Sequence, residues 1–235
     1  MRASIFQEEK NLWRKGFKRI VGLDESGRGP LAGPVLAAAV LVKAECKFKF
    51  GNDFTGINDS KKLSKKKRER FYKLIIRNPF IEWGIGRVSE KAIDKINILE
   101  ASKLAMIKAV ENLKSKAKNL KIDYLVIDGN FKIDYPLLQK PIIKADEKVF
   151  SCMAAGIIAK VVRDRLMDKC HKKYPLYGFD KNKGYPTKQH FQAIKKHGSI
   201  KIHRKSFRLL KNYRVFDTIE TYDCTKTKTH KIEEK

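Results

Sequence analysis

Two short apolar segments of this chain each end directly on carboxylates, and no other feature constrains the fold more. Residues 20–23 run into Asp24 and Glu25, and residues 124–127 run into Asp128. Compact runs rich in Val, Ile and Leu are typical of buried β-strands. Because α/β sheets build their sites at the carboxyl ends of strands, we expect these acids to meet at one edge of a sheet.

A fourth carboxylate, Asp146, follows another short strand candidate at residues 141–144. The four acids stand out because the chain is strongly basic, with 53 Lys and Arg against 26 Asp and Glu and a formal net charge of +27. Carboxylate oxygens suit hard divalent cations, and the surrounding basic residues would hold a polyanion against them. The pattern suggests phosphodiester chemistry on nucleic acid. A lysine-rich proteome is the alternative explanation of the charge.

The remaining pattern predicts a mixed α/β domain. Five segments are predicted strands because they are short, apolar and bounded by polar or turn residues: 19–23, 35–42, 80–88, 124–127 and 141–144. Helices are predicted where apolar residues recur every three or four positions, after the N-caps Ser64, Ser89 and Thr187 and over 99–113 and 148–172. The order of these elements has no regular βαβ alternation, which favours a mixed sheet with helices on its faces.

The 235 residues, 42% of them apolar, are sufficient for one well-packed domain. We expect a lead-in over residues 1–18, a catalytic domain over 19–186, a helical part over 187–215 and a flexible polar tail over 216–235. The four cysteines form no C-x-x-C pair, which favours reduced thiols and a cytoplasmic protein. The longest apolar stretch, residues 31–42, is too short to span a membrane, so we expect no membrane association.

A glycine-rich turn follows the first predicted strand, as it does in dinucleotide-binding proteins. Here Gly27, Gly29 and Gly33 have the spacing G-x-G-x-x-x-G, with Pro30 inside and a strand predicted where a helix should begin. The sequence also has no Walker lysine motif and no H-E-x-x-H, so nucleotide-cofactor and zinc-hydrolase sites are not supported. The turn instead allows close approach of its backbone to a ligand, with Arg28 presenting donors.

Six motifs occur in order along the chain: GLDESGRGPLAGPVLAAAV (22–40), NDSKKLS (58–64), LVIDGN (125–130), KADEKVFSCMAAGIIAKVVRD (144–164), YGFDKNKGY (177–185) and HRKSF (203–207). Together they resemble the ribonuclease HII family over residues 18–210. The resemblance implies an RNase H-like α/β fold, a five-stranded mixed sheet flanked by helices with a C-terminal helical extension. It also implies a monomeric, Mg²⁺- or Mn²⁺-dependent endoribonuclease. Such enzymes cut the RNA strand of RNA/DNA hybrids and the 5′ side of ribonucleotides embedded in duplex DNA, leaving 3′-hydroxyl and 5′-phosphate ends.

The resemblance also implies roles for particular residues. The metal-binding and catalytic carboxylates would be Asp24, Glu25, Asp128 and Asp146. The segment Gly27-Arg28-Gly29 matches the one that recognises the 2′-hydroxyl at the RNA–DNA junction. Tyr185 matches the tyrosine that packs on the sugar of the following deoxynucleotide. Such a pair would distinguish a ribonucleotide from its neighbours by the one group that differs.

Other basic and polar residues are candidates for holding the nucleic-acid backbone: Ser60, Lys61, Lys62, Lys160, Arg163, Asn182 and Lys183. Lys160 and Arg163 lie one helical turn apart and are expected to face the nucleic acid. For Ser60, Lys61 and Lys62 the alternative is a solvated, lysine-rich helix face. His203 and Arg204 either contact phosphate or cap the C-terminal part. Gly156 stands where the family commonly has serine, which puts one phosphate contact in doubt.

Two other classes of protein remain open at the level of sequence. A related RNase H-like nuclease, such as a Holliday-junction resolvase or an integrase-type enzyme, would use the same carboxylates but needs no 2′-hydroxyl reader. A non-catalytic nucleic-acid binder would use the acids structurally, so metal would not affect its behaviour. The sequence fixes neither the preferred metal, nor the division of roles among the acids, nor the preference between long hybrids and single ribonucleotides.

Overall fold

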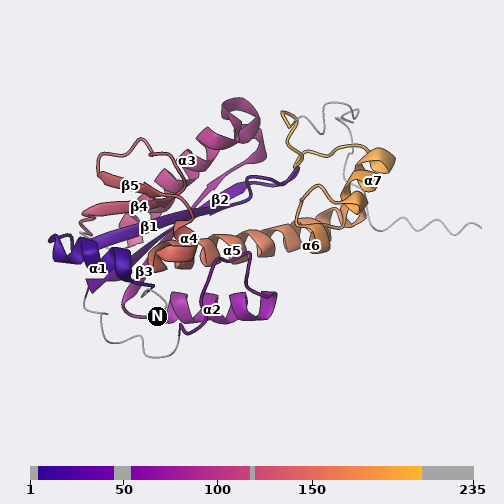
Figure 1. Ribbon diagram of the computed structural model, residues 1–235. Coiled ribbons are helices and arrows are strands. Elements are labelled where there is room, and N and C mark those ends of the chain that lie inside the picture. Colours follow the sequence, from indigo (N-terminus) through magenta and orange to yellow (C-terminus); the bar gives the residue numbers. More distant parts are fainter. Residues whose placement is uncertain (1–4, 45–53, 117–119, 208–235) are drawn as a thin grey trace, which may run out of the picture.

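A computed structural model describes residues 5–44, 54–116 and 120–207, and its centre is a five-stranded mixed sheet (Figure 1). The strands are Arg19–Ser26 (β1), Val35–Lys43 (β2), Ile81–Val88 (β3), Tyr124–Asp128 (β4) and Leu138–Ile142 (β5). The helices are Gln7–Arg14 (α1), Lys65–Arg77 (α2), Glu90–Lys116 (α3), Ala145–Lys148 (α4), Phe150–Lys173 (α5), Phe179–Asn182 (α6) and Lys188–His197 (α7), with a 3₁₀ turn at Pro175–Tyr177 (η2). The predicted fold class is confirmed.

The strand order is β3-β2-β1-β4-β5, with antiparallel pairing on one side of β1 and parallel pairing on the other. The parallel register pairs Leu23 with Ile127, so the acids that follow them leave the sheet side by side. The fifth strand lies three residues earlier than the predicted segment 141–144. That prediction is wrong in position because Lys144 adopts a left-handed conformation (φ 58°), which turns the chain into α4.

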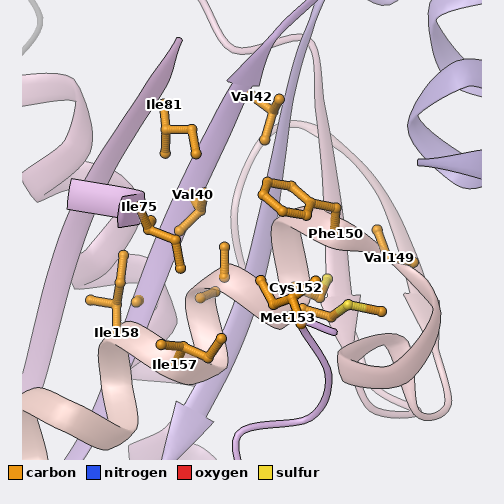
Figure 2. Packing of buried hydrophobic residues seen from close by; sticks show 14 of the residues in the cluster. Val40, Val42, Ile75, Ile81, Val149, Phe150, Cys152, Met153, Ile157 and Ile158 are labelled. Atoms are coloured by element: carbon orange, nitrogen blue, oxygen red, sulfur yellow. The ribbon is translucent and has the colours of Figure 1, made fainter. Parts of the chain in front are cut away.

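Helices cover both faces of the sheet, with α5 and α2 on one face and α3 on the other. Every residue of β2 from Val35 to Val42 is therefore buried, as expected for a strand that contacts apolar layers on both sides. Figure 2 shows part of this apolar cluster, to which Val40, Val42 and Ile81 of the strands and Phe150 and Ile158 of α5 belong. This packing fixes the position of α5 relative to the end of β1.

The predicted N-caps are confirmed. The hydroxyls of Ser64, Ser89 and Thr187 each accept a hydrogen bond from the backbone N–H three residues later, at 3.3, 3.4 and 3.2 Å. The two helices predicted after Ser89 and over 99–113 are both present as the two parts of α3, which meet at Asn97, whose backbone is not helical (φ 64°). The Asn97 carboxamide oxygen accepts from the N–H groups of Leu99 and Glu100, so it caps the second part of the helix.

The N-terminal helix α1 packs on this core through Leu12 and Trp13. Its Glu9 carboxylate is fully buried and accepts hydrogen bonds from the N–H and hydroxyl of Ser151, both at 2.9 Å, at the start of α5. Burial raises the pKa of Glu9 to about 7. None of the helices in the described ranges is both long and apolar enough to cross a membrane. The predicted tail, 216–235, lies outside the described residues, as does 208–215.

Candidate active site

Three of the four predicted carboxylates come together at one edge of the sheet. Asp24, Asp128 and Asp146 each offer an oxygen atom, and these oxygens all lie within 4.8 Å of one another. Asp24 lies near the end of β1, Asp128 ends β4, and Asp146 belongs to α4. The Asp128 carboxylate accepts a hydrogen bond of 2.7 Å from the Ala145 N–H, which ties α4 to the end of β4 and brings Asp146 to the other two acids.

Glu25 lies beside this cluster and outside it. Consecutive residues of a strand point to opposite faces, so Glu25 leaves β1 in a different direction from Asp24. One Glu25 oxygen accepts a hydrogen bond of 3.3 Å from the Arg28 guanidinium. The other, Oε2, is buried and has no hydrogen-bond partner among the described residues. Its place as a metal ligand therefore stays a prediction.

The site concentrates negative charge that Lys61 and Arg28 offset only in part. Burial, reinforced by the neighbouring carboxylates, raises the pKa of Asp24 well above its usual range and that of Asp146 to about 6. The pKa values of Glu25 and Asp128 are also raised, chiefly by burial. Partial burial lowers the pKa of Lys61, but the carboxylates around it outweigh this and raise it overall. Clustered oxygen donors with excess negative charge fit hard divalent cations.

The glycine turn and Tyr185 lie next to each other, directly beyond the end of β1. Arg28 and Gly29 are exposed, and a side-chain carbon built on Gly29 would come within 3.7 Å of the Tyr185 ring. The Lys160 ammonium lies 5.5 Å from the centre of that ring and pairs with Asp164 at 2.7 Å. The structure therefore brings the turn, Lys160 and Tyr185 to one place beside the acids, although they are far apart in sequence.

Comparisons with known proteins agree with this geometry. The family model described as Ribonuclease HII matches residues 21–210. The chain belongs to the ribonuclease HII family. A ribonuclease HII from Bacillus subtilis is 46% identical over 200 residues, covering 85% of this chain and 73% of the relative. One from Desulfotalea psychrophila is 48% identical over 206 residues, covering 87% of each.

Solved structures give the same result for the fold. The ribonuclease H2 from Pyrococcus horikoshii superimposes with a TM-score of 0.63 at 27% identity, covering 82% of this chain and 95% of that one. The Mn²⁺ complex of Bst-RNase HIII superimposes with a TM-score of 0.64 at 18% identity, covering 83% of this chain and 68% of that one, and shares the fold. This member of the ribonuclease HII family is a metal-dependent endoribonuclease, and the cluster of Asp24, Asp128 and Asp146 is consistent with metal-dependent catalysis.

Two residues expected at the nucleic-acid surface of this ribonuclease lie in its interior. The Arg163 side chain is fully buried, and its guanidinium donates to the carbonyls of Ala32, Pro34 and Lys183. Asn182 is buried as well and bridges the chain around it, donating to the Tyr177 carbonyl and accepting from the Gly184 N–H. Both side chains shape the loops that carry the turn and Tyr185 instead of facing outward.

The other predicted contacts differ in exposure. Ser60 is buried beside the acids, whereas Lys61 and Lys62 are exposed, and Lys62 pairs with Glu147 at 2.9 Å. Lys183 has a left-handed backbone (φ 51°), and its ammonium pairs with Asp168 and donates to the Asp180 carbonyl. These pairs occupy the Lys62 and Lys183 side chains in the free protein.

Sequence reasoning missed the part that Gly156 of α5 plays at the acidic cluster. A side-chain carbon at Gly156 would overlap the Oδ2 atom of Asp24. The backbone of α5 therefore lies so close to this carboxylate that only glycine fits at residue 156. The other Asp24 oxygen accepts from the Glu25 N–H at 2.6 Å. The absence of a side chain at residue 156 therefore leaves room for the Asp24 carboxylate, which no local pattern reveals.

Two buried histidines form a second unpredicted feature, behind Tyr185. The Ile200 N–H donates to His203 Nδ1 at 2.8 Å, and a backbone N–H can only donate, so His203 carries its proton on Nε2. That Nε2 lies 3.1 Å from His190 Nε2, and His190 Nδ1 lies 3.0 Å from the Tyr185 carbonyl. This series of hydrogen bonds, from the Ile200 N–H through both histidines to the Tyr185 carbonyl, holds the Tyr185 backbone in place. Burial lowers the pKa of both rings, that of His203 to about 3.

Proposed function

We propose that this ribonuclease cuts the 5′ side of a ribonucleotide embedded in duplex DNA, and the RNA strand of RNA/DNA hybrids, leaving 3′-hydroxyl and 5′-phosphate ends. The observation that carries the proposal is the position of the turn relative to the acids. Arg28 hydrogen-bonds to Glu25, the residue next to Asp24, and Gly29 adjoins Tyr185. A nucleotide read by this turn would have its phosphate close to the three aspartates.

Recognition in this proposal depends on a turn and a ring. A 2′-hydroxyl is the only group that separates a ribonucleotide from the neighbouring deoxynucleotides, and the exposed backbone donors of Arg28 and Gly29 in the turn suit it. The Tyr185 ring would pack on the next sugar and exclude a second hydroxyl by crowding. Lys61, Lys62 and Lys160 are exposed or half-buried around the acids, where their ammonium groups would hold backbone phosphates.

Hydrolysis in this proposal uses the four carboxylates. Divalent ions bound there would activate the attacking water and neutralise charge on the leaving 3′-oxygen. Asp24 and Asp128 would hold these ions, Asp146 would complete the set, and the unpartnered Oε2 of Glu25 would orient the water. A bond forms between the water oxygen and phosphorus, and the bond from phosphorus to the 3′-oxygen breaks. The attacking water releases a proton to solvent, and the 3′-oxygen takes one up from solvent to become the hydroxyl. The enzyme would act as a monomer in the cytoplasm, removing ribonucleotides from DNA.

Oxygen ligands alone accept either Mg²⁺ or Mn²⁺, and both are proposed cofactors. The test is cleavage of an end-labelled DNA duplex containing one ribonucleotide, in Mg²⁺, in Mn²⁺ and in EDTA, with the all-DNA duplex as control. We expect a metal-dependent cut just 5′ of the ribonucleotide and none in the control. Cutting of long hybrids alone would remove the recognition roles of Arg28 and Tyr185, and no cutting with either metal would contradict the proposed reaction.

A further inference from the structure

The loop between β1 and β2 is held from behind by two buried arginines. Arg204 is fully buried, and its guanidinium donates to three carbonyls of this loop: Gly27 at 2.6 Å, Arg28 at 3.0 Å and Gly33 at 2.9 Å. Arg163 holds the other end of the loop, through Ala32 and Pro34, and joins it to Lys183 near Tyr185. In the described part of the chain neither guanidinium forms an ion pair with a carboxylate.

Backbone hydrogen bonds hold the loop in the same position. The Leu31 N–H donates to the Gly184 carbonyl, the Arg204 N–H donates to the Leu31 carbonyl, and the Gly33 N–H donates to the Ile202 carbonyl, each at 2.8 Å. The loop thus lies between the Tyr185 segment and residues 202–204, at the end of the sheet where α6 and α7 lie (Figure 1). A side-chain carbon at Gly27 would overlap the Arg163 guanidinium, so this contact requires glycine there.

The direction of these carbonyls determines where the turn's N–H groups point. In a trans peptide the C=O and the following N–H point in opposite directions, and the described residues contain no cis peptide bond. Because the Gly27 and Arg28 carbonyls point inward at Arg204, the N–H groups of Arg28 and Gly29 point away from it, on the exposed side of the turn. Neither N–H donates to another group within the described ranges. A charged donor on each carbonyl also polarises its peptide and strengthens the opposite N–H as a donor.

We propose that Arg204 is a specificity-determining positioning residue, which aims the N–H groups of Arg28 and Gly29 at the 2′-hydroxyl of the ribonucleotide, while Arg163 keeps this turn in register with Tyr185. The inference rests on the proposed function and deepens it, because it names the residues that position the turn proposed to recognise the 2′-hydroxyl. It assigns Arg204 of the HRKSF motif an internal role and not a phosphate contact. Lysine cannot replace Arg204, since one ammonium does not span the Gly27, Arg28 and Gly33 carbonyls at once.

The first test is the binding preference of the full chain for a duplex with one ribonucleotide over the same duplex in all-DNA form. Binding is measured in Ca²⁺, whose looser coordination disfavours cleavage. We expect Arg204→Lys to reduce the preference about tenfold, equivalent to about one hydrogen bond, while affinity for the all-DNA duplex changes less than about twofold. Arg165→Lys is the matched control, because Arg165 is an exposed arginine of α5 that pairs with Glu69. An unchanged preference in folded Arg204→Lys, or an equal loss for both duplexes, would overturn the proposal.

The second test uses the unaltered protein, so it can be carried out even if Arg204→Lys does not fold. Amide hydrogen exchange of the unaltered protein is followed in Ca²⁺, free and with each duplex. We expect the Arg28 and Gly29 amides to become protected by the ribonucleotide duplex and not by the all-DNA duplex. Equal exchange with both duplexes would overturn the inference. Cleavage at the ribonucleotide in Mg²⁺ or Mn²⁺ is scored separately, so an enzyme that cuts there without protecting these amides contradicts this inference alone.

Discussion

Two groups of buried charges lie at the same end of the sheet and have opposite signs. The acidic cluster of Asp24, Asp128 and Asp146 holds like charges together with Lys61 offsetting them only in part, and its pKa values are raised. The arginines Arg163 and Arg204 are as deeply buried, but backbone carbonyls satisfy their donors. The first group is incomplete without a cation, whereas the second is complete within the protein. We infer that the acids serve binding and chemistry and that the arginines serve positioning.

The largest effect should come from removing one charge of the acidic cluster. Asp24→Asn keeps the size of the side chain but weakens divalent-cation binding, so we expect cleavage of the ribonucleotide duplex to fall at least about a thousandfold. Duplex affinity should change little, because basic residues outside the cluster supply most of it. Single-turnover cleavage and equilibrium binding measure the two quantities. A fully active Asp24→Asn enzyme would show that this aspartate is not a metal-binding residue.

The arginines should contribute to stability. Arg163→Met removes the donors of two buried carbonyls and one half-buried carbonyl, and unsatisfied buried groups cost about 1–3 kcal/mol each, so we expect a loss of about 3 kcal/mol or more in the free energy of unfolding. The matched control is Arg165→Met, two residues along the same helix and exposed, which should change stability by less than about 1 kcal/mol. Urea unfolding of both variants measures the difference. Equal effects would contradict the contrast between the two regions.

Cation binding should depend on pH at the acidic cluster. The pKa of Asp146 is raised to about 6, so a bound ion must displace a proton at lower pH. We expect Mn²⁺ affinity to weaken by up to about tenfold per pH unit for each proton displaced, as pH falls from 7 to 5. Isothermal titration calorimetry at several pH values measures this. In the metal-free protein, the contribution of these carboxylates to the free energy of unfolding should change in the opposite direction, because protonation removes the repulsion between them as pH falls. A pH-independent Mn²⁺ affinity would show that the cluster is fully ionised.

The histidine pair behind Tyr185 should have the smallest effect, and its sign is opposite. The pKa of His203 is lowered to about 3, so its stabilising contribution is complete above about pH 6.5 and is lost as pH falls toward 3. The carboxamide oxygen of His203→Asn can still accept from the Ile200 N–H. Between pH 7 and pH 5 we expect the free energy of unfolding to fall by about 1–2 kcal/mol less in this variant than in the unaltered protein.

Urea midpoints at the two pH values measure this difference. His197→Asn, in α7 but outside the hydrogen-bonded chain, serves as the control. If His203→Asn and the unaltered protein lose the same stability on acidification, His203 does not titrate in the way its burial implies.

Local patterns predicted the sheet and most of the acidic cluster. Asp24 and Asp128 directly follow short apolar runs, and the carboxyl ends of neighbouring parallel strands meet at one edge. The N-caps at Ser64, Ser89 and Thr187 were predictable for the same reason, since a cap depends on residues three positions away. The fifth strand was misplaced because its limit is set by a left-handed turn at Lys144, a conformation that lysine rarely adopts.

The sequence by itself determined which residues carry charge, where four of the five strands lie, and that Asp24 and Asp128 leave neighbouring strands together. Only the tertiary structure decided that Glu25 lies outside the aspartate cluster, that Gly156 leaves room for Asp24, and that Arg163 and Arg204 lie in the interior. Hydropathy places an arginine at the surface, because burying its charge is unfavourable without partners. The partners of Arg204 are carbonyls of Gly27, Arg28 and Gly33, more than 170 residues away along the chain, and only folding brings them within hydrogen-bonding distance.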